Sequence, residues 1–263
     1  MDSSPEIENI FRRLYERLAK FYPDEKRVEY DKYLEKSGLS TLINNQHGDM
    51  VFLIDVRKID VIHISGNVFE HTGYQMEEFG ENIASGFMNL YEKTHLSFTN
   101  TLLFWVMNIL GPLPAKQKAK QNISVWGLKI LNKNGNEMRW YMNIMPLEYD
   151  SLLNPTLILL VVQDITHLVK GNAYHIRGVF GDEEKKIFSY QSEDDKTVEQ
   201  EIISDREKEV LKLIKQGLDT KSIAMLLNIS PNTVDNHRRN SLARTGSRDT
   251  TALIHLCKMM GII

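Results

Sequence analysis

The stretch SDREKEVLKLIKQGLDTKSIAMLLNISPNTVDNHRRN, residues 204–240, carries the strongest local signals for structure in this chain. Ser204 and Glu207 have the spacing of a capping box, in which each side chain hydrogen-bonds the backbone of the other at a helix start. Gly217 ends that first helix, and Asp219 can cap a second one. The stretch therefore begins with two short helices joined by a tight turn.

A third helix is predicted to follow, because Ser230 can cap it and Pro231 is tolerated in a first helical turn. One side of this helix can pack inward through Val234, Ser241, Leu242 and Thr245. The other side carries Asn232, Asp235, Asn236, Arg239, Asn240 and Ala243. A fourth helix is predicted from about Arg248 to Met260.

The outward side of the third helix has the chemistry to read DNA. Asparagine bridges adenine and arginine bridges guanine in the major groove, each contributing about 1–3 kcal/mol of discrimination. Arg238 and Lys221 flank this side and can hold phosphates, which positions a protein without reading sequence. The alternative is a solvated helix whose polar residues have no partner.

Charge is divided unevenly along the 263 residues, whose net charge is -3. Residues 200–263 hold ten Lys and Arg against seven Asp and Glu, so the rest of the chain is acidic. An acidic body with a basic C-terminal domain suits a polyanionic partner, although the excess is small.

The C-terminal segments 204–211, 216–224, 229–240 and 245–248 together resemble the LuxR/NarL-type helix-turn-helix domain. The resemblance implies that Asn236 and Arg239 read bases, with further contacts to double-stranded DNA from the same helix. It also implies that the fourth helix, around Leu253, Leu256 and Met260, serves a dimer contact. The DNA-binding residues expected on this basis are Asn232, Thr233, Asp235, Asn236, Arg238, Arg239, Asn240 and Lys221.

Asp235 departs from the common pattern of this family, in which many members carry lysine. A carboxylate repels phosphate but can accept a hydrogen bond from cytosine N4, so it can redirect specificity. It also leaves open an interaction adaptor that keeps the fold without binding DNA.

Upstream, the hydrophobic period changes to that of strands. Met50–Ile54 and Asp60–Ile64 read as two strands, and a helical middle reaches about Leu110. Three further strands are predicted at 124–131, 137–147 and 156–165, the first two joined by a turn at Asn134-Gly135. The last strand is apolar on both faces, as a central strand would be. The order predicts an antiparallel sheet with helices on one side.

A second stretch resembles the PAS domain: it carries Asn67, Glu70, Gly73 and Tyr74, followed by an acidic pair and Phe79. Asp164-Ile165-Thr166 resembles the end of its last strand. The fold class expected is thus α+β: a PAS-like five-stranded antiparallel sheet with helices, followed by an all-α four-helix helix-turn-helix domain. The expected domains are an N-terminal helical extension at 1–44, the PAS-like sensor at 45–170, a linker at 171–199 and the DNA-binding domain at 200–263.

PAS domains bind a small molecule or a partner, or dimerise, so the resemblance names no signal and no cofactor. His63, His71 and His95 are available as haem ligands, but no spacing singles one out and structural or surface roles are favoured. The only cysteine, Cys257, lies in the C-terminal domain and reads as a small buried hydrophobe, which argues against flavin photochemistry. A ligand cavity and a solid aromatic core are both open, and candidate lining residues are Phe52, Ile54, Phe69, Tyr74, Trp105, Trp126 and Trp140.

Several function classes are disfavoured. The sequence shows no nucleophile elbow, phosphate loop, metal cluster or paired-carboxylate motif, so no catalytic or metal residue is predicted. A phosphorylated receiver domain is an alternative, with Asp55 at the end of a strand as phospho-acceptor. Such a domain requires a parallel sheet, which the hairpin predicted at 124–147 contradicts. No apolar run reaches membrane-span length and the first residues are acidic, so we expect a cytoplasmic protein without a membrane partner. The chain therefore reads as a homodimeric transcriptional regulator that senses a ligand or partner and binds DNA.

Overall fold

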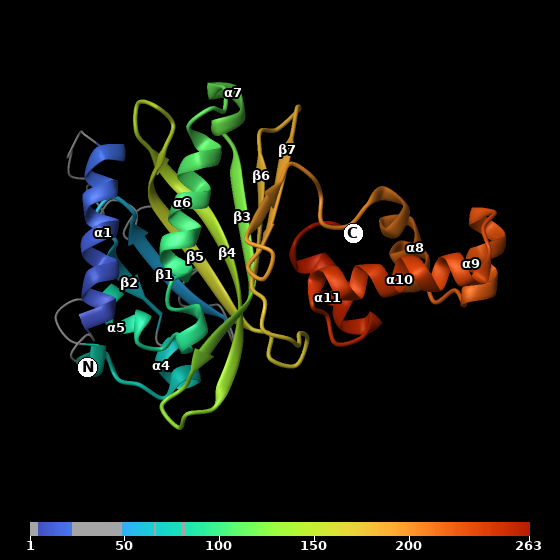
Figure 1. The fold of residues 1–263 in the computed structure, drawn as a ribbon, viewed down its shortest axis with the longest axis horizontal. Coiled ribbons are helices and arrows are strands. Elements are labelled where there is room, and N and C mark those ends of the chain that lie inside the picture. The colour runs from blue at the N-terminus through green and yellow to red at the C-terminus, as the bar shows by residue number, and fades with distance from the viewer. Residues whose placement is uncertain (1–4, 23–48, 66, 80–82) are drawn as a thin grey trace.

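The computed structural model describes residues 5–22, 49–65, 67–79 and 83–263. Its described residues form an eight-stranded antiparallel sheet with helices, followed by a C-terminal group of four helices (Figure 1). The α+β class and the all-helical C-terminal part are confirmed. The sheet has three strands more than the five predicted.

The strands follow the order β2-β1-β5-β4-β3-β6-β7-β8. The pairing is antiparallel throughout, so the receiver interpretation is wrong. β5 lies between β1 and β4, which accounts for its apolar residues on both faces. The strands are β1 Met50–Asp55, β2 Asp60–Ile64, β3 Gln121–Leu131, β4 Glu137–Tyr149, β5 Pro155–Asp164, β6 His175–Phe180, β7 Lys186–Gln191 and β8 Lys196–Val198.

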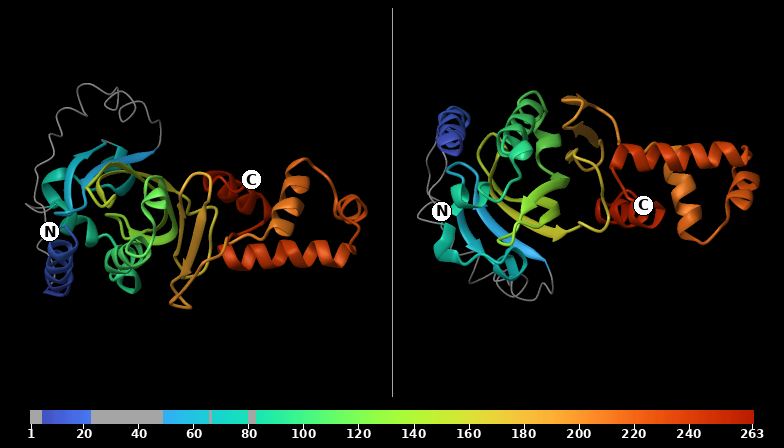
Figure 2. Two further views of the ribbon diagram at one scale, coloured as in Figure 1. Left: turned by 90° about the horizontal axis from the view of Figure 1, so that it is seen from above. Right: turned by 60° about the horizontal axis from the view of Figure 1, so that its bottom comes forward.

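Helices cover one face of the sheet (Figures 1 and 2). The first helix, α1, packs on its own domain, because Leu14 and Leu18 are buried and Ile7 contacts Met88. The remainder of the expected 1–44 extension, beyond residue 22, lies outside the described residues. The elements before the third strand are α1 Pro5–Phe21, α4 Asn67–Thr72, η1 Met76–Phe79, α5 Ile83–Met88, η2 Lys93–His95, α6 Phe98–Leu110 and α7 Ala115–Lys118.

The expected linker at 171–199 is wrong, because this segment extends the sheet. β6 pairs with β3, β7 with β6 and β8 with β7. The charged residues that suggested a linker gather in the two turns, at 182–185 and 193–195, rather than along the strands. A composition average over the whole segment therefore concealed three short strands, of which β6 and β7 carry buried residues.

The C-terminal helices are α8 Asp205–Lys215, α9 Thr220–Leu227, α10 Pro231–Thr245 and α11 Thr250–Met259. The capping box of Ser204 and Glu207 is present, and Asp219 caps α9 through the Ser222 N–H at 2.7 Å. These four helices lie beyond β6 and β7, and α10 extends from α9 back toward the sheet (Figure 1).

Candidate DNA-binding site and ligand cavity

The turn between α9 and α10 sets the direction of the third helix. Asn228 adopts a left-handed conformation with φ of 52° and its N–H closes the end of α9. The Ser230 hydroxyl then accepts the Thr233 N–H at 3.1 Å, and Pro231 occupies the first turn. A polar residue that tolerates positive φ, followed by a cap and proline, thus makes the sharp change of direction in a helix-turn-helix.

A small apolar core holds α10 against α8 and α9. Val210, Ile223, Ala224 and Val234 form this core and are all buried. At the other end of α10, Arg244 pairs with the buried carboxylate of Glu207, which the capping box already engages. The sequence interpretation did not single out Arg244, because an ion pair between two helices has no signature in local spacing.

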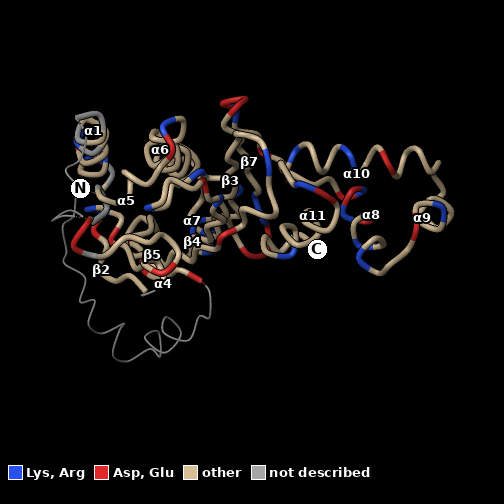
Figure 3. Tube along the Cα trace, turned by 90° about the horizontal axis from the view of Figure 1, so that it is seen from below, with Lys and Arg blue, Asp and Glu red and all other residues tan. Residues whose placement is uncertain are grey.

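Asn232, Asn236, Arg239 and Asn240 are all exposed on α10. They lie at helical spacings of three and four, so they share one face, opposite the buried Val234, Ser241 and Thr245. Lys221 is exposed at the start of α9. The face therefore presents two kinds of side chain that can hydrogen-bond base edges, amide and guanidinium, with a lysine at its border. Figure 3 shows that α10 carries both basic and acidic positions along its length.

Three other predicted contacts are engaged within the protein. Asp235 and Arg238 form an ion pair at 3.1 Å, one helical turn apart and partly exposed. The Thr233 hydroxyl lies 2.8 Å from that of Ser230, within the helix cap. Each of these side chains therefore already has an internal partner, with which a contact to DNA would compete.

The sheet domain holds an apolar cavity of about 150 Å³ between β1, β4, β5 and the helices α5 and α6. Phe52, Ile54 and Trp140 line it, as predicted for a pocket. Its remaining lining comes mainly from aliphatic and aromatic residues that the sequence interpretation missed, because that interpretation looked for aromatic side chains rather than for one face of α6. These are Val56, Ile59, Val61, Phe87, Met88, Tyr91, Phe98, Thr99, Leu102, Leu103, Met142, Ile144, Ile158 and Leu160.

Four of the predicted lining residues lie elsewhere. Trp126 is on the opposite face of the sheet, where its Nε1 donates to the Thr245 carbonyl of α10 at 3.0 Å. A bulge at Gly127, between Trp126 and Leu128, shifts the strand register and decides which side chain faces which side. Trp105 borders a separate groove beside β7, while Phe69 and Tyr74 pack around Phe79. Their assignment to this cavity is therefore wrong.

Few polar groups face the cavity. Thr99 donates to the Tyr91 hydroxyl at 3.4 Å, and burial raises the pKa of Tyr91. The indole Nε1 of Trp140 is buried and has no hydrogen-bond partner among the described residues. The cavity can accordingly accept a small, uncharged and mostly apolar molecule.

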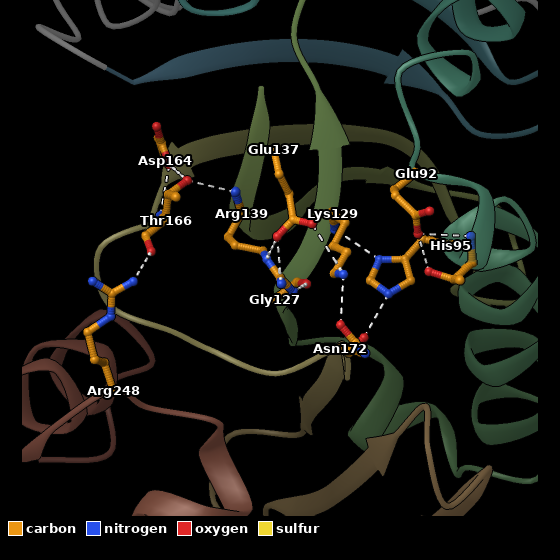
Figure 4. Close-up of polar contacts among 11 residues, drawn as sticks. Glu92, His95, Gly127, Lys129, Glu137, Arg139, Asp164, Thr166, Asn172 and Arg248 are labelled. Atoms are coloured by element: carbon orange, nitrogen blue, oxygen red, sulfur yellow. Dashed lines mark hydrogen bonds and ion pairs between the residues drawn. The ribbon is translucent and has the colours of Figure 1, made fainter. Parts of the chain in front are cut away.

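A chain of polar contacts leads from the helix side of the sheet to the C-terminal helices (Figure 4). The His95 ring accepts the Lys129 N–H at 2.8 Å, and the Lys129 ammonium contacts Glu137 at 3.2 Å. Glu137 also holds Arg139, whose N–H donates to the Thr166 hydroxyl at 2.8 Å. Burial lowers the pKa of His95, so this ring acts as a neutral structural group.

The α11 helix packs on the face of the sheet opposite the cavity. Leu253, Leu256 and Met260 are buried in one cluster with Trp126 and Tyr141. The dimer contact implied for these residues is therefore not available in this structure, since the chain's own sheet covers them. Cys257 is buried in the same cluster, where burial raises its pKa to about 12, as expected of a small hydrophobe.

Among the residues that the structure describes, no helix has both the length and the apolar character needed to cross a membrane. In the same ranges, no three His, Cys, Asp or Glu side chains gather as a metal site would require.

Comparisons with known proteins place the C-terminal helices in a family. Residues 201–257 match the model described as "Bacterial regulatory proteins, luxR family". The transcriptional regulatory protein FixJ of Rhizobium meliloti is 44% identical over 57 residues, which are 22% of this chain and 26% of FixJ. The match thus spans about a quarter of that relative.

Two solved structures match more of the chain at low identity. The phage VqmA–DPO complex is 15% identical, covers 89% of both chains and has a TM-score of 0.32. The VqmA dimer of Vibrio cholerae, described without target DNA, is 15% identical over 85% of this chain and 87% of that one, with the same TM-score. An identity of 15% and a TM-score of 0.32 do not establish a shared function. Residues 201–257 thus match the luxR family of bacterial regulatory proteins, and α8–α11 have the geometry of a helix-turn-helix.

Proposed function

We propose that this protein is a transcriptional regulator that binds double-stranded DNA by placing α10 in the major groove. The observation that carries the proposal is the exposed α10 face of Asn232, Asn236 and Arg239, held by caps and a core on its opposite side. The major groove admits an α-helix and displays a different pattern of donors and acceptors for each base pair.

Each residue of the site has a role in this proposal. Asn236 reads adenine and Arg239 reads guanine, while Lys221 holds a phosphate. Arg238 contacts phosphate after leaving its ion pair with Asp235, so Asp235 weakens general attraction to DNA. Asn232, Thr233 and Asn240 complete the contact at the helix start and border.

We further propose that the sheet domain is a PAS-like sensor whose cavity controls DNA binding. The antiparallel order β2-β1-β5-β4-β3 and the apolar cavity beneath α6 support this proposal. Apolar cavities near 150 Å³ stay dry and accept guests of about the size of benzene. The ligand class is thus a small, neutral, mostly apolar ring compound or a hydrocarbon of that size.

The cavity proposal is tested by thermal unfolding with a series of neutral aromatic compounds. Binding to the native state raises the melting temperature as concentration rises. Leu102→Phe fills the cavity and should abolish the shift, whereas Leu152→Phe at an exposed turn should leave it intact. An equal shift in both variants would place the binding outside the cavity.

A homodimer bound to an inverted repeat is the proposed assembly, because two-fold symmetry in the protein matches two-fold symmetry in the site. An adaptor that has lost DNA affinity is the second candidate, and the Asp235–Arg238 ion pair is the observation that favours it. The two candidates differ in salt dependence, since only binding through phosphate contacts weakens steeply with salt.

The deciding experiment selects random-sequence duplexes with the full-length protein and then measures affinity at several salt concentrations. A short enriched motif, with affinity falling steeply as salt rises, supports specific DNA binding. The symmetry of the motif reports on the dimer. Absence of any enrichment at low salt, with and without cavity ligands, would exclude the DNA-binding proposal in favour of the adaptor.

A further inference from the structure

The connection between β5 and β6 runs along the end of α10. The Lys170 N–H donates to the Gly246 carbonyl at 2.8 Å, and the Arg248 N–H donates to the Leu168 carbonyl at 2.8 Å. Val169 and Ser247 pair as an antiparallel bridge between these two bonds. The sheet domain is therefore hydrogen-bonded through its backbone to the turn between α10 and α11.

These backbone contacts lie at the C-terminal end of the exposed α10 face proposed to read bases, called the reading face below. Asn232, Asn236, Arg239 and Ala243 recur at intervals of three or four, and Gly246 is the next position in that series. Gly246 has φ of 66°, and a Cβ there would meet the Lys170 carbonyl oxygen at 3.2 Å. Lys170 thus belongs to the sheet domain yet lies where the reading face ends.

The length of α10 brings this end to the DNA backbone. A helix of 15 residues is about 22 Å long, whereas the major groove is about 12 Å wide. In the proposed binding mode, a helix whose first turns read bases therefore extends past the groove edge, where the phosphates lie.

Two cations stand at this end without an acidic partner. Lys170 and Arg248 are both exposed, and neither forms an ion pair within the described chain. Arg248 makes one long hydrogen bond, from its Nη2 to the Thr166 carbonyl at 3.4 Å (Figure 4). The neighbouring carboxylate of Asp249 is used to cap α11, accepting the Ala252 N–H at 2.9 Å.

We propose that Lys170 and Arg248 form a phosphate clamp, which binds the DNA backbone at the C-terminal end of α10. The inference rests on the proposed DNA binding and extends it, because Lys170 lies outside the luxR-family residues 201–257. The sheet domain then touches DNA itself while it is docked on α11. A change in that docking moves Lys170 relative to α10 and so changes affinity without changing which bases are read.

The test measures binding of full-length protein to the selected duplex over a range of salt, with Lys170→Gln and the matched control Lys58→Gln. Lys58 is an exposed lysine in the turn between β1 and β2, near the opposite edge of the sheet. Lys170→Gln should weaken binding about two- to fivefold on every sequence and lower the salt slope by about 1 per protomer. Lys58→Gln should change neither quantity, and Lys170→Arg should retain binding.

A second measurement locates the contact. Each phosphate of the duplex is replaced in turn by an uncharged methylphosphonate, and the loss of affinity is compared between the wild type and Lys170→Gln. Replacement of a phosphate at the edge of the motif should cost less affinity in Lys170→Gln than in the wild type, because only Arg248 then remains to contact it. Equal losses at every phosphate, or identical binding by Lys170→Gln and Lys58→Gln, would overturn the clamp while leaving DNA binding intact. A wild-type protein that binds no duplex would overturn the proposed function itself.

Discussion

Arg239 is an exposed side chain of α10 for which the structure gives no ion pair within the described residues. Its neighbour Arg238 pairs with Asp235, so only one of the two adjacent arginines has an acidic partner among the described residues. A free guanidinium can offer two donors to one guanine, whereas a paired one must first give up a carboxylate. Under the proposed DNA binding, the difference favours Arg239 for base reading and Arg238 for backbone contact.

Arg239→Ala should therefore lower affinity for the selected site by about 1–3 kcal/mol and relax preference at one base position. The loss arises because one bidentate contact disappears while the helix keeps its caps and core. Affinities for the site and for its single-base variants check this expectation. Lys215→Ala, an exposed lysine on α8, is the control and should leave the preference unchanged. Equal loss on all sequences would instead place Arg239 on a phosphate.

His175 is a second residue whose environment predicts a measurable effect. It is buried, stacks on Trp126 with ring centroids 4.9 Å apart, and has an Nδ1 without a partner in the described chain. Burial lowers its pKa from 6.5 to about 4, because the charged ring would lose its water. The unfolded chain binds a proton near pH 6.5, and the folded chain does so only near pH 4.

Stability from neutral His175 is thus complete above pH 6.5 and is lost as the pH falls from 6.5 toward 4, by on the order of 3 kcal/mol. Denaturant unfolding of the wild type and of His175→Phe at several pH values checks this. The stability difference between them should shrink or reverse in sign as the pH falls, since other titrating groups are common to both. Parallel pH curves would contradict the buried neutral state.

At the scale of elements, β6 and the segment leading into α8 are joined by a buried ion pair. Arg177 contacts both carboxylate oxygens of Glu201, at 2.7 and 2.6 Å, and also donates to the Met260 carbonyl. Both side chains are largely buried, with exposed fractions of 6% and 13%. The pair therefore ties the sheet to both ends of the C-terminal domain.

Glu201→Ala should lower the free energy of unfolding by about 3–5 kcal/mol, because it leaves a buried guanidinium unpaired. Chemical denaturation followed by far-ultraviolet circular dichroism measures this change. Glu199→Ala removes the acid of the exposed pair with Lys186 and should cost about 1 kcal/mol or less. Similar costs for the two variants would show that water reaches Arg177.

At the scale of the whole molecule, the two parts share a hydrophobic core. Trp126 and Tyr141 from the sheet pack with Leu211, Leu253 and Leu256 from the C-terminal helices. The Tyr141 hydroxyl also donates to the Met259 carbonyl at 3.0 Å. A shared core of this kind couples the two parts during unfolding and fixes the direction of α10 relative to the sheet (Figure 2).

Unfolding should consequently follow one cooperative transition rather than two. All three tryptophans lie in the sheet part, so tryptophan fluorescence reports on that part and, through Trp126, on its contact with the C-terminal helices. Far-ultraviolet circular dichroism reports on the helices of both parts, and the two curves should coincide. Trp126→Ala removes a side chain from the centre of the shared core and should separate the transitions. Two transitions in the wild type would mean that the parts unfold independently.

The sequence by itself determined the C-terminal helices, their caps and the side of α10 that carries Asn236 and Arg239, since these depend on spacings within a few residues. It also determined the strands β1–β5, because their alternation or apolar runs are local patterns. Only the tertiary structure decided that residues 171–199 extend the sheet, that Trp126 faces away from the cavity, and that α11 is covered by the sheet. Strand pairing, a bulge at Gly127 and the choice of partner for an apolar face depend on residues far apart in the chain, whose contacts leave no periodic signal.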